Sequence, residues 1–287
     1  MLTATMVKDC AIRGGADLCG IASIDRFRDC PPETHPLSLF PDARSVIVYA
    51  SRILKGCYKG IQEGTDWSTY WIYGYGSGIY SSLGSATEAV AGLLEEHGYE
   101  AVASPGGHTL LDEAPPARAP LGPGRRPPCI MLHMRLSAAL AGLGELGWSK
   151  VFLTPEFGPR QRFEILLTDA ELEPDPLFEE PLCDHCLACV RECPGKALGG
   201  ERQAVTVDDR EFAWGRVDCG KCKVTHWGLN PAASPFVRKD LPGMRMEVEK
   251  TGYTWYEAYR LGFALAERIE YLRLIAHGSA EHGQGGR

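Results

Sequence analysis

The sequence predicts a mixed α/β (α+β) fold, because strand patterns and helix patterns alternate along its first part. Residues 45–51, SVIVYAS, form a short apolar run rich in β-branched side chains, which is typical of a strand buried on both faces. Residues 83–97 carry apolar side chains at helical spacing, and Gly98 supplies a stop signal for that helix. Residues 99–104, YEAVAS, then predict another strand. We therefore expect a strand, helix, strand unit in which helices cover the buried strand.

Further elements extend this unit on both sides. Residues 5–23 predict a helix that leads into a short strand, LCGIAS, with Gly14 and Gly15 at the turn between them. Residues 162–169, RFEILLTD, predict a strand as well. Before that strand, an apolar stripe at helical spacing predicts one more helix, formed by Leu136, Ala139, Leu140, Leu143 and Leu146.

Prolines and cysteines divide the chain into three parts. Pro174 and Pro176 mark the end of an α/β domain over 1–175, and a cysteine-rich module over 176–240 follows. Residues 241–287 predict a C-terminal helix, docked on the first domain, and a polar tail. Within the first domain, residues 104–129 are rich in Pro and Gly, so this long loop is either a lid or disordered chain.

The composition excludes several classes of protein. Hydrophobic residues make up 44% of the 287 residues and charged residues 23%, which is ordinary for a globular chain and unlike a disordered one. The net charge of -7 and the lack of a dense Lys and Arg stretch argue against a nucleic-acid partner. The N-terminal residues lack the apolar core of a secretory signal, and no run approaches the ~20 apolar residues of a membrane span. We expect a cytoplasmic protein without a membrane partner.

Cysteine spacing gives the clearest functional signal. Six of the eleven cysteines fall between Cys183 and Cys222, and in a reducing compartment such clustering favours metal binding over disulfides. The first four, Cys183, Cys186, Cys189 and Cys193, have the spacing C-x2-C-x2-C-x3-C of bacterial ferredoxins and precede a proline. A tight loop with a ligand at every third residue directs its sulfurs to one cluster, while its amides point at the cluster sulfides. The sequence therefore predicts a 4Fe-4S cluster.

The fourth ligand and the number of clusters stay open at this point. In two-cluster ferredoxins the cysteine beside the proline serves the other cluster, so Cys193 has two alternative roles. Cys219 and Cys222 lie in VDCGKCKVTHWG, where His226 stands in place of the next expected cysteine. Either one cluster takes its fourth ligand from Cys219 or Cys222, or two clusters share six cysteines and at least two other ligands, of which His226 could be one. A zinc site from two Cys-x2-Cys pairs is the alternative, but it leaves two cysteines unexplained.

Five cysteines lie in the first half of the chain without metal-ligand spacing. We expect most of them to be small, buried, hydrophobic side chains. Cys129 follows the long loop and precedes a glycine-rich helix, so it is a candidate for a reactive or ligating thiol. The set consists of Cys10, Cys19, Cys30, Cys57 and Cys129.

Residues 136–198 carry a family resemblance. They run from LSAALAGLGELGW through TPEFGPR and RFEILLTD to CDHCLACVRECPGKAL, and they resemble the core of epoxyqueuosine reductases and, more distantly, of reductive dehalogenases. GADLCGIAS, PDARSVIVYA and YGYGSGIY also match the layout of those enzymes, so the resemblance covers roughly residues 10–225. It is specific, because these motifs follow one another in one order at close spacing. The resemblance implies a nitroreductase-like α/β domain that holds cobalamin, joined to a ferredoxin-like module that passes electrons to the cobalt.

A cobalamin site would fall on the glycine-rich helix predicted over AGLGELGW. Gly142, Gly144 and Gly147 would let the backbone approach a large flat macrocycle, and Trp148 would offer an aromatic wall. The alternative is close helix packing for the glycines and core filling for the tryptophan. A glycine in a helix costs about 1 kcal/mol, which indicates a reason for its presence without choosing between the two.

The chain also departs from that family. The stretch RRPPCIMLHMR, just before the AGLG motif, contains no acid where epoxyqueuosine reductases use a carboxylate as proton donor. A second complete set of cluster cysteines, a helical extension for tRNA and the twin-arginine signal usual in reductive dehalogenases are all missing. We therefore expect neither action on tRNA nor dehalogenation. The remaining proton-handling candidates are His133, Tyr75 and Tyr80, and the alternative for each is a local role in a core or an interface.

Two hypotheses of function result. In the first, the chain is an enzyme, a reductase whose cluster relays single electrons to cobalamin, so that the reduced cobalt attacks a small substrate. In the second, it is an electron-transfer or activating protein that reduces a corrinoid protein or another partner, which the missing acid and the shortened module favour. Both need a low-potential electron donor such as a ferredoxin or flavodoxin. We expect the first, and a lid over 104–129 that closes on a pocket would favour it.

Overall fold

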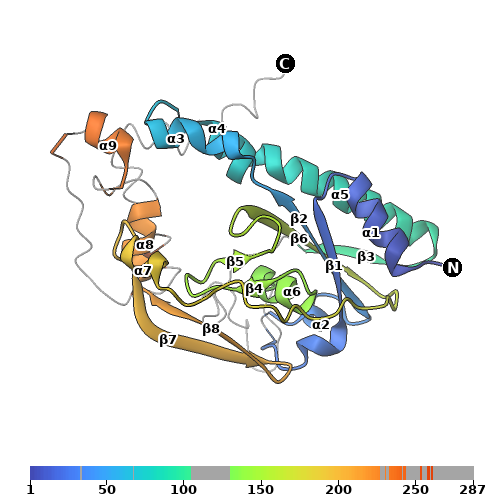
Figure 1. Ribbon diagram of the computed structural model, residues 1–287. Coiled ribbons are helices and arrows are strands. Elements are labelled where there is room, and N and C mark those ends of the chain that lie inside the picture. The colour runs from blue at the N-terminus through green and yellow to red at the C-terminus, as the bar shows by residue number, and fades with distance from the viewer. Residues whose placement is uncertain are drawn as a thin grey trace, which may run out of the picture. The chain divides into compact units, whose positions relative to one another are not determined.

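The computed structural model of the chain describes residues 1–32, 34–66, 68–104, 130–226, 230, 233–240, 242–243, 253, 257–258 and 260 (Figure 1). The chain divides into two compact units. The first consists of Met1–Cys186 and Arg202–Gly215, and the second of Leu187–Glu201 and Arg216–Arg287. Most of the predicted C-terminal part over 241–287, Cys129 and the loop over 105–129 lie outside the described residues.

A four-stranded sheet forms the centre of the first unit. Its order is β1 (Leu18–Ser23), β2 (Ser45–Arg52), β6 (Gln161–Thr168) and β3 (Ala101–Ser104), and all neighbouring strands are antiparallel. These strands confirm the four strand predictions. Every residue of β2 except Arg52 is buried, as the unbroken apolar pattern of that strand predicts.

Helices cover both faces of this sheet (Figure 1). On one face, α1 (Ala4–Arg13) and α5 (Ser77–Glu96) pack side by side on Ile47, Tyr49 and Leu166. On the other face, α6 (Met134–Leu140) packs on the alternate strand residues. The predicted stop of α5 is confirmed, because Gly98 adopts a left-handed φ of 84° just beyond the helix end.

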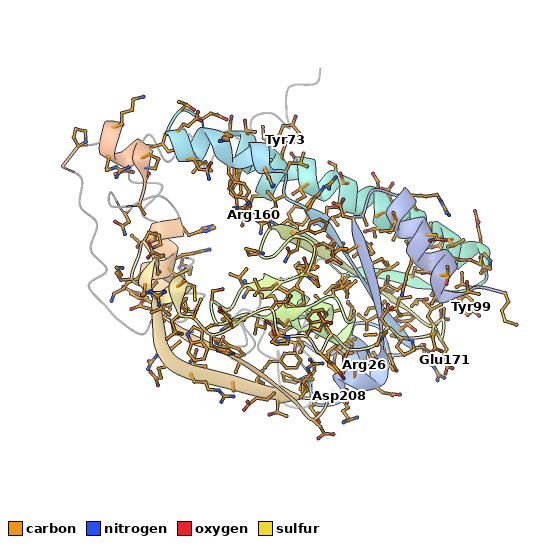
Figure 2. All side chains as sticks on the ribbon, in the orientation of Figure 1. Arg26, Tyr73, Tyr99, Arg160, Glu171 and Asp208 are labelled. Atoms are coloured by element: carbon orange, nitrogen blue, oxygen red, sulfur yellow. The ribbon has the colours of Figure 1, made fainter. Side chains whose placement is uncertain are left out.

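The helix predicted up to Leu146 ends earlier than the apolar stripe indicates. α6 stops at Leu140, and a hairpin of β4 (Glu145–Leu146) and β5 (Phe152–Leu153) follows. Gly142 and Gly144 have φ angles of 76° and 149°, which end the helix. The guanidinium of Arg26 (Figure 2) donates a hydrogen bond of 2.5 Å to the carbonyl of Leu140 and so satisfies a free carbonyl at the helix end.

A second hairpin lies within the predicted cysteine-rich module, where no strand is predicted. It consists of β7 (Leu198–Val207) and β8 (Arg210–Val217). Asp208 and Asp209 both have positive φ at its turn, which is the conformation that tight hairpins require. Arg28 pairs with both carboxylates, at 2.8 Å to Asp208 and 2.7 Å to Asp209.

Both units also contain short helical elements. Those of the first unit are η1 (Ile24–Phe27), α2 (Pro36–Leu39), η2 (Lys55–Tyr58), α3 (Lys59–Glu63), α4 (Ser68–Tyr70) and η3 (Trp71–Tyr75). Those of the second unit are α7 (Ala188–Arg191), α8 (Cys219–His226) and α9 (Pro235–Asp240). In the described part of the chain, no helix combines the length and the apolar character that crossing a bilayer requires.

Candidate metal centre

None of the ten cysteines in the described part of the chain forms a disulfide. Of the six predicted metal ligands, Cys183 and Cys186 belong to the first unit. The other four, Cys189, Cys193, Cys219 and Cys222, belong to the second.

In the first unit, the backbone of Cys183 is held by a carboxylate. Oε1 of Glu145, on β4, accepts the N–H of Leu182 at 2.7 Å and also accepts the N–H of Cys183. The sulfur of Cys183 is held by the hairpin of β4 and β5, because the N–H of Trp148 donates to Sγ of Cys183 at 3.4 Å. Amide donors to a cysteine sulfur are the outer-shell contacts that stabilise a thiolate ligand.

The hairpin turn that carries Trp148 is itself fixed. The carbonyl of Trp148 accepts the N–H of Gly215 at 2.8 Å, and its ring meets the ring of His185 edge-on at 5.4 Å. Lys150 is buried, with its ammonium 4.4 Å from the ring centre of Trp214. Trp148 therefore contacts Cys183 through its backbone N–H and His185 through its ring, and it is half-buried rather than a core residue.

The segment between the cysteines turns tightly. His185 and Leu187 both have positive φ, at 54° and 56°, which is uncommon for residues with a side chain. Oδ1 of Asp184 accepts the N–H of Cys186 at 3.1 Å, and hydrogen bonds from Cys186 lower the pKa of Asp184. A turn of this kind is what a ligand at every third residue requires.

In the second unit, Cys193 lies in a turn that packs on α8. Its Sγ accepts the N–H of Ala197 at 3.3 Å. A Cβ on Gly195 would come within 2.2 Å of Oγ1 of Thr225, so only glycine allows this approach to α8. Cys219 begins that helix, and the N–H of Cys222 donates to the carbonyl of Asp218 at 2.9 Å.

The donor set fits an iron–sulfur cluster by its chemistry. Cysteines outside any disulfide stand at cluster spacing in the sequence, and the sulfurs of two of them accept backbone N–H groups, which is the environment expected of thiolates on iron. Among the described residues, no three or more His, Cys, Asp or Glu side chains form a group that could hold a metal ion as they stand. The cluster thus stays a prediction from spacing and local contacts.

The predicted cobalamin glycines have a different explanation in this structure. A Cβ on Gly142 would lie 2.2 Å from the carbonyl oxygen of Pro176, and one on Gly144 would lie 2.0 Å from that of Leu153. On Gly147, a Cβ would lie 2.9 Å from the side chain of Leu153. Described parts of the chain occupy the Cβ side of these glycines, so the space that the missing side chains leave is used for packing. Close packing, although not in a helix, accounts for their identity.

The proton-handling candidates do not lie together. Tyr75 ends η3, with the guanidinium of Arg162 5.1 Å from its ring centre, and Tyr80 lies on α5. Burial raises the pKa of Tyr80. His133 is buried at the start of α6, which covers the opposite face of the sheet from α5. Tyr75 and Tyr80 therefore form one candidate set with Arg162, and His133 is apart from it.

Sequence reasoning missed two carboxylates. Glu145 was seen only as part of the AGLGELGW motif, and nothing in the sequence places it against Cys183. Glu164 lies opposite Tyr49 on the face of the sheet that α1 and α5 cover, and burial raises its pKa to about 7. The alternation along β6 is a usable signal for it, since Glu164 is two residues from the buried Leu166 and must share its face.

Comparisons with known proteins agree with the expected resemblance. No protein-family model matches the chain. It is 38% identical over 105 residues to a tetrachloroethene reductive dehalogenase of Dehalobacter restrictus, and the aligned segment covers 32% of this chain and 19% of that protein. The enzyme of that name from Sulfurospirillum multivorans is 39% identical over 119 residues, covering 36% of this chain and 23% of that protein. The matched segments thus span about a fifth of the length of these relatives.

Solved structures extend the similarity to the fold. A reductive dehalogenase described with a mechanism for B12-dependent dehalogenation superposes with a TM-score of 0.52 at 18% identity, over 97% of this chain and 36% of that chain. An epoxyqueuosine reductase from Bacillus subtilis aligns with a TM-score of 0.48 at 18% identity, over 67% of this chain and 52% of that chain. The resemblance expected from the motifs is confirmed, and the first of these structures shares the fold.

Proposed function

We propose that the chain is an iron–sulfur oxidoreductase that passes single electrons from a 4Fe-4S cluster to a bound cobalamin for the reduction of a small substrate. The series Cys183, Cys186, Cys189 and Cys193 carries this proposal. It supplies four cysteines at cluster spacing that form no disulfide, and the sulfurs of the first and the last accept amide N–H groups. Similarity to proteins that are reductases by name supports redox chemistry.

Cys219 and Cys222 are the further ligands of this proposal. Both lie on α8, the helix against which the turn at Cys193 and Gly195 packs. Either of them supplies a fourth ligand, or the pair belongs to a second cluster together with Cys193. His226, the last residue of α8, is the non-cysteine candidate for that second site.

The two cofactors would supply the redox chemistry, the cluster as a one-electron carrier and cobalamin as a reducible cobalt centre. The thiols and their amide donors hold the first. Cobalamin is assigned to the α/β unit on similarity alone, because Gly142, Gly144 and Gly147 pack on the chain itself. The electron donor of this proposal is a low-potential protein such as a ferredoxin or flavodoxin.

Tyr75, Tyr80 and His133 are the residues proposed to handle protons, and Arg162 lies beside Tyr75. Arg162 donates to the hydroxyl of Tyr70 at 3.1 Å and to the carbonyl of Gly74 at 3.1 Å, which fixes its guanidinium beside Tyr75. Burial raises the pKa of Tyr80 and outweighs the opposing charge of Arg162, so that phenol stays protonated.

Anaerobic purification tests the proposal. Iron, sulfide and cobalt are measured in the purified full chain, which is then titrated with cobalamin while its absorbance is followed. We expect brown protein with about four irons per chain, or about eight for two clusters, and saturable cobalamin uptake. Colourless, iron-free protein that contains zinc would contradict the iron–sulfur function.

A second candidate function is favoured by the glycine contacts. An electron-transfer or activating protein for a corrinoid protein needs no cobalamin site of its own, and the packing of described residues against Gly142, Gly144 and Gly147 supports this alternative. Iron-containing protein that takes up no cobalamin, but reduces a corrinoid protein in a coupled assay, would select this function over the first.

A further inference from the structure

We infer that Glu145 is a positioning residue for Cys183, which it holds in the orientation of a cluster ligand. This inference rests on the proposed iron–sulfur function and adds a residue that is neither a ligand nor part of the cysteine motif. One carboxylate oxygen, Oε1, accepts two consecutive backbone N–H groups, those of Leu182 and Cys183. Hydrogen bonds to an ionised acceptor are roughly twice as strong as those between neutral groups.

The side chain of Glu145 has no further hydrogen bond and no ion pair among the described residues. It is partly buried, so the two amides would lose an acceptor that water replaces only in part. The carboxylate therefore holds the chain that enters the cysteine loop, and in the described part of the protein no cation competes for it.

Glu145 is itself held in place by the hairpin. It pairs with Leu153 across β4 and β5, and the preceding residue, Gly144, has no room for a Cβ beside the carbonyl of Leu153. From the same hairpin, the N–H of Trp148 donates to Sγ of Cys183. Two residues three apart thus fix the backbone and the sulfur of the first ligand from one rigid turn.

A fixed first ligand has a measurable consequence. Outer-shell partners of metal ligands typically contribute 10-fold to 100-fold to metal affinity. The negative charge of Glu145 beside the ligand also disfavours the addition of an electron to the cluster. Removal of the carboxylate should speed the loss of the cluster and raise its reduction potential.

The test compares three variants of the anaerobically purified full chain with the wild type. Glu145→Ala removes the acceptor and the charge, and Glu145→Gln keeps an oxygen acceptor but removes the charge. Glu156→Gln is the matched control, because Glu156 is exposed on the nearby turn and makes no hydrogen bond to a described residue. Iron loss to a chelator is timed, the potential is measured by EPR-monitored titration, and amide exchange at Leu182 and Cys183 is followed in each protein.

We expect Glu145→Ala to lose iron about 10-fold faster than the wild type and to lose amide protection at Leu182 and Cys183. Glu145→Gln should retain iron better than Glu145→Ala while its potential still rises, and Glu156→Gln should match the wild type. Wild-type rates, protection and potential in Glu145→Ala would overturn the role of Glu145 and leave the cluster intact. Iron-free wild-type protein would overturn the proposed function itself, so the two failures are distinguishable. Should Glu145→Ala fail to fold, an unchanged reduction potential together with wild-type iron loss in Glu145→Gln would overturn the inference.

Discussion

The cysteines of the sheet core and those of the segment 183–222 have the same side chain in opposite surroundings. Cys30 is buried in a cluster of apolar side chains, and burial raises its pKa to about 12, as it does for Cys19. Cys183 and Cys193 instead accept backbone N–H groups at their sulfurs, and Cys186 is exposed. The difference teaches that the donors around a sulfur, and not the number of cysteines, distinguish a packing thiol from a proposed ligand.

The largest expected effect comes from exchanging one cysteine of each kind. Cys183→Ala should remove cluster iron almost completely, because the first thiolate of the loop is lost. Cys30→Ala should keep the iron of the wild type and lower the free energy of unfolding by about 1 kcal/mol, as a small core truncation does. Iron content per folded chain and urea unfolding measure the two outcomes. Equal iron in both variants would break the distinction between the two kinds of thiol.

Thiol labelling sharpens the same distinction by rate. In native protein freed of iron, a thiol with a pKa near 12, such as Cys30, has on the order of 1000-fold less thiolate near neutral pH than an ordinary thiol. Iodoacetamide should therefore modify the exposed Cys186 first and reach Cys30 only after unfolding. Mass spectrometry of timed samples identifies the modified residues. Early modification of Cys30 in folded protein would contradict its assignment as a packing thiol.

Glycines show a similar contrast between the hairpin of β4 and β5 and the helix α5. Gly144→Ala would place a Cβ 2.0 Å from the carbonyl oxygen of Leu153 at a φ of 149°, so we expect a loss of about 2 kcal/mol or more in the free energy of unfolding. Gly84→Ala, the control in α5, meets nothing within 4 Å and should stabilise the protein by about 0.5–1 kcal/mol. Thermal unfolding of the cofactor-free proteins measures both. Unchanged stability with lost cobalamin uptake in Gly144→Ala would restore the cofactor explanation.

The sequence could predict what depends on side-chain periodicity. The strands at 45–51 and 162–169 and the helix at 83–97 were all found, because burial on a sheet or a helix follows a period of about 2 or 3.6 residues. The helix end at Leu140 was missed, since the apolar stripe continues through the turn and only the φ angles of two glycines end the helix.

In the candidate site, too, only the features that are local in the sequence could be predicted. Cysteine spacing is local in the sequence and could indicate the ligands, whereas the contact of Glu145 with Cys183 joins residues 38 positions apart. A contact between such distant residues leaves no periodic signal. The hairpin of β7 and β8 was missed for a related reason: its burial pattern is mixed, and the tight turn is made by Asp208 and Asp209 without glycine.

The smallest expected effect concerns Glu164, a carboxyl whose pKa is raised by burial, as the pKa values of the core thiols are. Burial on the face covered by α5 raises its pKa from 4.5 to about 7, so the folded chain keeps a proton that the unfolded chain releases. Between these two pH values the unfolded state binds fewer protons than the folded state, and the free energy of unfolding must fall as pH rises. The contribution is complete below pH 4.5 and lost above pH 7.

Glu164→Gln should remove this pH dependence and stabilise the protein above pH 7 by about 1 kcal/mol, since partial exposure screens the charge. Glu171→Gln, at an exposed carboxyl (Figure 2), is the control and should keep the wild-type slope. Urea unfolding at several pH values between 4.5 and 8 measures the slopes, with the lower limit set by the ordinary pKa of glutamate. If the free energy of unfolding of Glu164→Gln varied with pH as in the wild type, this carboxyl would be ionised in the folded protein. Burial in this core would then raise the pKa of thiols without raising that of a carboxyl.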